Sequence, residues 1–256
     1  MTAFCRFADT ILSMPHLGSD DFLPASLRLT RDGAFETYYA PFEHLNRDAR
    51  ITLCGITPGL QQARNALNTA RQCLQRGMSH AEALAQAKRT ASFSGPLRSN
   101  LVAMLNHIGL PAGLGIQDSA QLFGHHAHLV HYTSALRNPV FQAGKNYSGS
   151  PAMLKQPALR AQIESTLMEE VAALPATLFL PLGAQVAEVF QWLVDQGVLK
   201  PTQVLSGMPH PSGANAERIA YFLQRKPRAA LSKRVNPVPL DRARQAMLSQ
   251  VAAFAN

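Results

Sequence analysis

The segment Ile51-Thr52-Leu53-Cys54-Gly55-Ile56-Thr57-Pro58-Gly59 runs from an apolar stretch into a rigid turn of glycine and proline. Short apolar stretches bounded by such turns are typical of buried strands in α/β proteins. About 150 residues later, the apolar residues 204–208 lead into a second turn of this kind, His210-Pro211-Ser212-Gly213. Because the ends of parallel strands meet at one edge of a sheet, the polar residues of the two turns are expected to share a site.

The rest of the chain alternates between helical and apolar stretches. Helices are predicted over residues 3–14, 64–88 (one or two), 97–107, 157–173, 184–195 and 215–224, and further strands over 129–132, 177–181 and 204–208. This alternation favours an α/β fold of three layers, α/β/α, with a mainly parallel central sheet. No linker or repeat divides the chain, so one domain over residues 1–256 is expected.

Composition limits the class of protein. A chain of 256 residues with 46% hydrophobic content can bury a full core. It has no apolar run of about 18 residues and no signal-peptide pattern, which predicts a cytoplasmic protein without a membrane partner. Cys5, Cys54 and Cys73 have no disulfide or metal-ligand spacing, so no metal or other cofactor is expected, and Cys54 is predicted to be a buried hydrophobe.

The net charge of +8 is concentrated near the end of the chain. Residues 217–256 contain eight basic and two acidic side chains, a balance of +6. Such a basic segment predicts salt-dependent contacts to phosphates, whereas a solvated helical face is the alternative for each single residue.

In this order the two turn motifs resemble the signature motifs of the uracil-DNA glycosylase superfamily. Cys54-Gly55-Ile56-Thr57-Pro58-Gly59-Leu60 is similar to the first motif of the mismatch-specific branch, and His210-Pro211-Ser212 to the second motif of the single-strand-selective branch. Residues 129–132 through Gly144-Lys145-Asn146 are similar to the middle region of the latter branch. The resemblance covers about residues 45–225 and implies a uracil-DNA glycosylase-like fold.

The resemblance also implies an activity and a partner. It points to a DNA glycosylase that hydrolyses the N-glycosidic bond of a deaminated, damaged or modified base, flipped out of single- or double-stranded DNA, and leaves an abasic site. A deaminated base would make the protein a repair enzyme, and a hypermodified viral pyrimidine would make it a defence enzyme. Neither motif contains a lysine that could form an imine, so the enzyme is expected to be monofunctional.

Two residues are expected to carry the chemistry. Excision leaves negative charge on the departing base, and the resemblance gives His210 the role of donating a hydrogen bond to it; a loop-capping histidine is the alternative. Thr57 stands where active relatives usually have an acidic or amide residue that manages water. A hydroxyl can orient water but cannot deprotonate it near neutral pH, and a turn residue bonded to its own backbone is the alternative.

The base pocket is expected to depart from the family pattern. Tyr132 stands where many relatives have an asparagine that reads a uracil-like edge, which argues against uracil specificity and for a pocket shaped for a different or modified base. Phe93 is expected to stack on the base, with a core position as the alternative, and Asn146 to contact a base edge, with a plain turn as the alternative. The other predicted pocket residues are Gly55, Ile56, Pro58 and Gly59.

The resemblance implies that the loop after the second motif enters the minor groove and helps to hold the base out of the helix, and its small residues permit the close backbone approach that this needs. It has no large apolar wedge, unless the helical segment at 64–90, expected to be an insertion, supplies one. Asn215 as a helix N-cap is the alternative to a DNA contact. The predicted DNA-binding residues are Lys145, Ser212, Gly213, Ala214, Asn215 and Arg218.

Two other functions stay open. Replacement of the water-managing residue by Thr57 motivates a reader that binds an altered base without cutting it. A hydrolase of free nucleosides or nucleotides is a third function, against which the basic segment argues.

Overall fold

The computed structural model describes residues 2–91 and 96–254. The chain divides into two compact units, each assembled from three stretches of sequence. The first unit contains Met1–Leu45, Ile56–Ser92 and Tyr132–Glu169, and the second contains Asn46–Gly55, Phe93–His131 and Glu170–Asn256. One boundary therefore falls between Gly55 and Ile56, inside the first turn motif.

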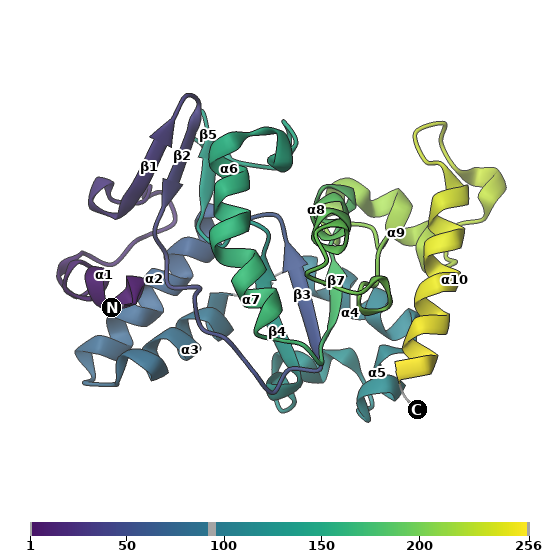
Figure 1. Ribbon diagram of the computed structural model, residues 1–256, viewed down its shortest axis with the longest axis horizontal. Helices are drawn as coiled ribbons and strands as arrows, with labels where there is room; N and C mark the ends of the chain where they lie inside the picture. Colours follow the sequence, from purple (N-terminus) through teal and green to yellow (C-terminus); the bar gives the residue numbers. More distant parts are fainter. Residues whose placement is uncertain (1, 92–95, 255–256) are drawn as a thin grey trace. The chain divides into compact units, whose positions relative to one another are not determined.

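The sheet of the first unit is antiparallel. Its strands are β1 (Arg28–Asp32), β2 (Phe35–Tyr38), β5 (Val140–Gln142) and β6 (Lys145–Asn146), in the order β1-β2-β5-β6 (Figure 1). The turn between β5 and β6 has positive φ angles at Ala143 (49°) and Gly144 (74°). Two such residues in succession match the twist of a two-residue hairpin turn.

Three helices pack together in the same unit. They are α1 (Ala3–Ser13), α2 (Leu60–Gln75) and α3 (His80–Ala91), and their buried faces share one apolar cluster with residues such as Tyr39 and Phe141. Spacings of three and four residues between buried side chains, as in Ala63, Ala66, Leu67 and Ala70 of α2, direct one face of the helix to this core. The predicted helix at 157–173 is present as α6 (Pro157–Gln162), a π turn (Ile163–Leu167) and α7 (Met168–Ala172).

The second unit contains the parallel sheet. Its strands run in the order β4-β3-β7, with β3 at Ile51–Gly55, β4 at Val130–Ser134 and β7 at Leu178–Pro181; Tyr132–Ser134 of β4 are counted in the first unit. β3 and β7 pair in parallel, Ile51 opposite Leu178, and every residue of both strands is buried. Burial of entire strands explains why their sequences are continuously apolar.

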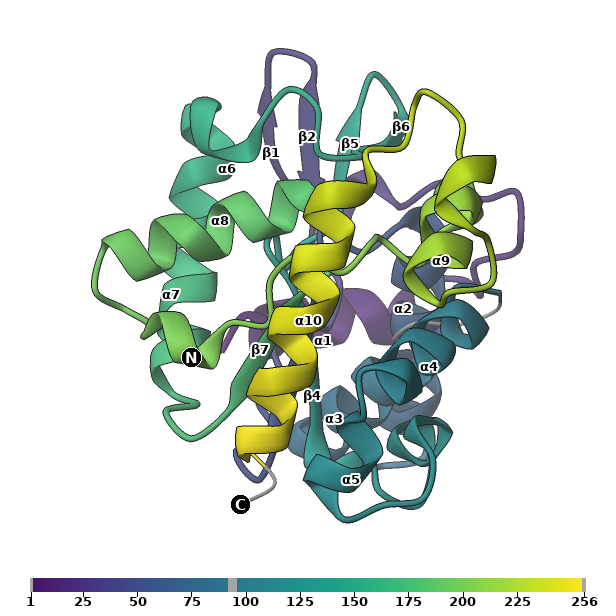
Figure 2. The same cartoon turned by 90° about the vertical axis from the view of Figure 1, so that its right-hand side faces the viewer.

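The helices of the second unit are α4 (Pro96–His107), α5 (Leu110–Leu114), α8 (Ala184–Asp195), α9 (Ala216–Phe222) and α10 (Pro237–Phe254). α8 contacts β7, where the rings of Phe179 and Phe190 lie 5.8 Å apart. α10 contacts both α9 and α5 (Figure 2). Single 3₁₀ turns occupy Ala25–Leu27, Ser119–Phe123, Ala127–Leu129, Met153–Lys155, Pro201–Gln203, Gly213–Asn215 and Arg228–Ala230.

The predicted α/β class and the parallel sheet are confirmed, with two corrections. The strand predicted at 204–208 is reduced to one parallel bridge between Val204 and Phe179, because Gly207 leaves extended geometry with φ +101° and Pro209 has no N–H for a ladder. The antiparallel sheet was not predicted, because β1 is mostly exposed and polar and gives no alternating pattern.

The predicted helices at 3–14, 97–107, 184–195 and 215–224 correspond to α1, α4, α8 and α9, and the segment at 64–88 forms α2 and α3. The prediction of one domain, and of an insertion at 64–90, stays a prediction. Within the described part of the chain, no helix combines the length and the apolar character needed to cross a membrane.

Candidate functional site

His210 lies in the second unit, where a backbone N–H holds its imidazole. Its Nδ1 accepts a hydrogen bond from the N–H of Ser212 at 3.2 Å. Nδ1 therefore carries no proton in the neutral ring, and Nε2 does. Nε2 has no hydrogen-bond partner within the described residues, so an N–H donor is unused in a side chain that is only partly exposed.

Burial lowers the pKa of His210 below its usual value. Desolvation penalises the charged imidazolium, so the neutral ring dominates at pH 7. A neutral imidazole with a single available N–H can donate to an oxygen that gains negative charge, without giving up its proton. The bond from the Ser212 N–H is the contact expected of a loop-capping histidine, the alternative predicted from the sequence, and the catalytic role of His210 stays a prediction.

Gly183 supports His210 from the end of β7. Its N–H donates to the Met208 carbonyl at 3.2 Å, and its φ of +91° lies in the region that favours glycine. A Cβ placed on Gly183 would lie 3.1 Å from Cβ of His210. Gly183 and His210 therefore approach each other closely because glycine has no side chain. Gly183 was not predicted to belong to the site, although a glycine two residues after an apolar strand is a signal for a special backbone position.

A hydrogen-bonded chain holds the loop after His210. Nδ2 of Asn100 on α4 donates to the Pro211 carbonyl at 2.9 Å, a contact between residues 111 positions apart that no local pattern predicts. Nδ2 of Asn215 lies 3.3 Å from Oγ of Ser212, and Nη1 of Arg218 lies 3.3 Å from Oδ1 of Asn215. Asn215 occupies the N-cap position of α9, which was the predicted alternative to a DNA contact, but its side chain makes no capping hydrogen bond.

The two small residues of this loop are open to solvent. Gly213 and Ala214 are both exposed, and no atom lies within 4 Å of a Cβ added to Gly213. The loop is therefore sterically able to approach another molecule at this point.

Thr57 lies in the first unit, and its hydroxyl is bonded to backbone groups. Oγ1 donates to the Asn138 carbonyl at 3.0 Å and accepts from the N–H of Val140 at 3.0 Å. The single hydroxyl proton is used, so Thr57 could only accept a hydrogen bond from water through its remaining lone pair. The partners lie more than 80 residues along the chain, so the hydroxyl does not bond its own turn as the alternative predicted, and the two bonds connect the first motif to the start of β5.

The rest of the first motif and Asn146 form a helix start in the same unit. Oδ1 of Asn146 accepts from the N–H of Leu60, the first residue of α2, at 2.9 Å. A Cβ on Gly59 would lie 3.4 Å from Nδ2 of Asn146. Because Oδ1 is fixed, the exposed Asn146 side chain presents Nδ2–H as a donor. Lys145 precedes it on the hairpin and is exposed.

The remaining predicted pocket residues are less accessible. Tyr132 is only 8% exposed in β4, and Pro58 is buried, so both contribute mainly to packing. Gly55 is buried as the last residue of β3 in the second unit, while Ile56 belongs to the first unit, where its carbonyl accepts from the N–H of Leu136. Phe93 lies outside the described residues.

The chain belongs to the class of mixed α/β proteins that contain a parallel sheet. No model of a protein family matches it, and no solved structure matches it. The uncharacterized protein YoxB of Bacillus subtilis (strain 168) is 37% identical over 225 residues, which cover 86% of this chain and 88% of that protein. The chain therefore belongs to the same family as YoxB.

Proposed function

We propose that this protein is a monofunctional DNA glycosylase of the cytoplasm, with the three-layer α/β/α architecture of the uracil-DNA glycosylase superfamily. The observation that carries the proposal is the state of His210, a neutral ring whose Nε2–H has no partner among the described residues. The resemblance of the two turn motifs to those of the superfamily supports the same function. The substrate is an altered base in DNA.

In the proposed reaction the bond between C1′ and the base nitrogen breaks, and its electron pair stays on the base. Negative charge collects on a carbonyl oxygen of the departing base, where Nε2–H of His210 donates a hydrogen bond. Water adds to C1′ of the cation-like sugar and its proton passes to the base through solvent. The products are a free base and an abasic site, so atoms and charge balance without a cofactor.

Stabilisation of the leaving base is the main catalytic effect in this proposal. The hydroxyl of Thr57 cannot donate to water, because its proton is given to the Asn138 carbonyl. Removal of a single oxyanion donor in other enzymes slows catalysis about 100- to 1,000-fold. We therefore expect His210→Ala to slow base release by about that factor, and Thr57→Ala to slow it less.

A reader that holds an altered base without cutting it is the second candidate. The same hydrogen bond of Thr57 favours it, because the first motif then has no group that could activate water. The two candidates differ in one observable quantity, which is the release of a base from DNA that the protein binds.

The experiment incubates the purified protein with natural DNA, virus-modified DNA and oligonucleotides that contain uracil, hypoxanthine or other altered bases. Mass spectrometry measures released base, and alkaline cleavage measures abasic sites. His107→Ala is the matched control, because His107 is a partly buried histidine of the same unit whose pKa is also lowered by burial. Thermal unfolding of each variant verifies that it is folded.

Release that His210→Ala removes and His107→Ala retains would support the glycosylase. Tight binding to one modified DNA with no release would support the reader. Release from free nucleosides, insensitive to salt, would contradict both, since contacts to DNA phosphates weaken as salt concentration rises.

A further inference from the structure

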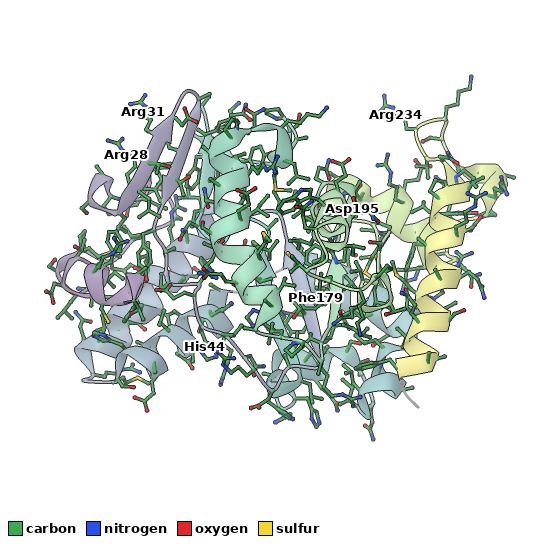
Figure 3. All side chains as sticks on the ribbon, in the orientation of Figure 1. Arg28, Arg31, His44, Phe179, Asp195 and Arg234 are labelled. Carbon is green, nitrogen blue, oxygen red and sulfur yellow. The ribbon has the colours of Figure 1, made fainter. Side chains whose placement is uncertain are left out.

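The loop between α9 and α10 consists of residues 223–236 (Figure 1). It combines a basic surface with a fixed conformation. It contains five basic residues and no acidic residue. Four of its cations are exposed, and no hydrogen bond or ion pair of their side chains occurs among the described residues; they are Arg225, Arg228, Lys233 and Arg234. Figure 3 labels Arg234 on this loop.

The fifth cation of the loop, Lys226, takes part in what we name the Glu217 clasp. The carboxylate of Glu217 on α9 accepts from Nζ of Lys226 at 2.7 Å and from the N–H and hydroxyl of Ser232 at 2.8 and 2.6 Å. These bonds connect the two sides of the loop to one side chain. They lower the pKa of Glu217 to about 2, so the clasp is ionised at neutral pH.

Two further contacts fix the same loop. Nη2 of Arg218 lies 3.2 Å from the Arg234 carbonyl, which holds the second half of the loop to α9. Below the loop, Tyr221, Val235 and Leu240 form a small buried cluster against which Leu231 packs. The backbone that carries the four exposed cations is therefore held in place before any partner binds.

The acidic groups nearest in sequence do not cancel this charge. Within residues 217–256 they are Glu217, which is used in the clasp, and Asp241, which bonds Arg244 at 2.9 Å and the Tyr221 hydroxyl at 2.8 Å. Four cations on a fixed loop, with neighbouring carboxylates already paired, produce a positive surface that is suited to a polyanion.

We propose that the loop at 223–236 is a preorganised binding surface for the sugar–phosphate backbone of DNA, and that the Glu217 clasp sets its conformation. The choice of DNA rests on the proposed function. Spaced cations on a rigid loop suit the regular phosphates of a nucleic acid, and they neutralise charge without reading sequence. Fixing the loop in advance lowers the ordering cost of binding.

The first test measures DNA affinity of the full chain as a function of salt, using an unmodified duplex so that no altered base contributes. In the variant R225Q/R228Q/K233Q/R234Q we expect binding at about 50 mM salt to weaken tenfold or more. The slope of log Kobs against log salt should become shallower by about 0.9 for each lost contact. The variant R76Q/R89Q/K155Q/K200Q removes the same charge from exposed positions elsewhere and should change both quantities much less.

The second test uses the sign of an electrostatic effect. Glu217→Gln makes the protein more positive, so charge alone predicts tighter binding to DNA. If the clasp sets the conformation of the loop, we expect the opposite, about threefold weaker binding. The neutral amide lacks the ion pair with Lys226, so the loop becomes less ordered. Glu188→Gln is the matched control, an exposed carboxylate of the same unit, and it should bind DNA as tightly as the wild type or more tightly.

Equal weakening by both quadruple variants, or tighter binding by Glu217→Gln, would overturn the proposal. The protein is also tested for binding to anionic phospholipid vesicles. If the loop variant loses vesicle binding to the same extent as it loses DNA binding, the proposal is overturned in favour of a membrane surface as the partner. Base release separates this proposal from the proposed function. If no base is released from any DNA, but the loop variant alone binds DNA more weakly, the proposed binding surface is supported and the proposed glycosylase activity is contradicted. If the loop variant binds DNA and releases base as the wild type does, the proposed glycosylase activity is supported and the proposed binding surface is contradicted.

Discussion

The N–H of Ser212 donates to Nδ1 of His210, and this bond decides which nitrogen of the imidazole carries the proton. A ring that accepts at Nδ1 presents a donor at Nε2 while it is neutral. Protonation would place hydrogen on both nitrogens and replace the accepted bond by a repulsive contact between two donors. The loop therefore favours the neutral ring in addition to the burial that lowers the pKa of His210.

Together with the proposed function, this relationship predicts how base release depends on pH. The pKa of His210 is lowered, so the neutral ring forms as pH rises through a value below about 6.5, the usual pKa of histidine. We expect the rate to increase over that acidic range and to be constant near pH 7 and above. Single-turnover rates between about pH 4.5 and 8.5 measure the profile. In His210→Gln, which keeps an N–H donor that does not titrate, the acidic limb should disappear. A rate that increases on acidification would contradict the neutral donor.

Gly183 is predicted to position His210. In Gly183→Ala the new Cβ meets Cβ of His210 at 3.1 Å, and the positive φ of 91° adds backbone strain of about 1–2 kcal/mol. We expect base release to decrease about tenfold or more, because small displacements of a catalytic group are costly. Gly197→Ala is the control: its φ is +73° and nothing lies within 4 Å of the new Cβ. It should lose similar stability in urea unfolding and retain the rate. Equal rates in the two variants would exclude a positioning role.

Thr57 is predicted to stabilise the first turn. Thr57→Val leaves the buried Val140 without its N–H acceptor and the Asn138 carbonyl without its donor. An unsatisfied buried polar group costs about 1–3 kcal/mol, so the free energy of unfolding should fall by about that amount. Thr57→Ser retains both bonds and should remain close to the wild type. Chemical denaturation of the three proteins tests this order, and a valine variant of unchanged stability would refute it.

Asn146 is predicted to have two separable roles. Asn146→Ala removes the acceptor of the Leu60 N–H and should lower the free energy of unfolding by about 1 kcal/mol. Asn146→Asp keeps the acceptor, and its charge suits a helix N-terminus, so its stability should be preserved. Both variants lack the Nδ2–H donor, and both should lose preference for the altered base over an unmodified one in competition binding. If Asn146→Asp keeps its preference for the altered base, Nδ2–H does not contribute to base recognition.

The sequence was most informative where local pattern and burial agree. β3 and β7 are apolar runs in which every residue is buried, and α1, α4 and α8 have apolar residues at helical spacing. The turn residues between these elements were also predictable, because glycine and proline restrict the backbone locally. Exposed, polar β1 has neither signal, so the antiparallel sheet became visible only in the structure.

The residues of the candidate site could be named from the sequence, but their bonding state could not. The motifs identified His210, Thr57 and Asn146 as residues of interest, and the sequence also located the basic segment. The Ser212 N–H decides which nitrogen of His210 is protonated. The hydroxyl of Thr57 is hydrogen-bonded to backbone groups about 80 residues away. The roles of Gly183 and Asn100 depend on contacts with residues far along the chain.

The sequence by itself determined the α/β class, most helices of the chain, the two turn motifs and the excess of positive charge. Those properties follow from residue type and near-neighbour spacing, which act over one or two turns of backbone. Only the tertiary structure decided the structural role of Thr57, the bond from Asn100 that holds the loop after His210, and the fixed conformation of the basic loop. The reason is physical: each depends on a hydrogen bond whose partner is chosen by folded geometry, and a donor or acceptor in a sequence does not specify the group that will satisfy it.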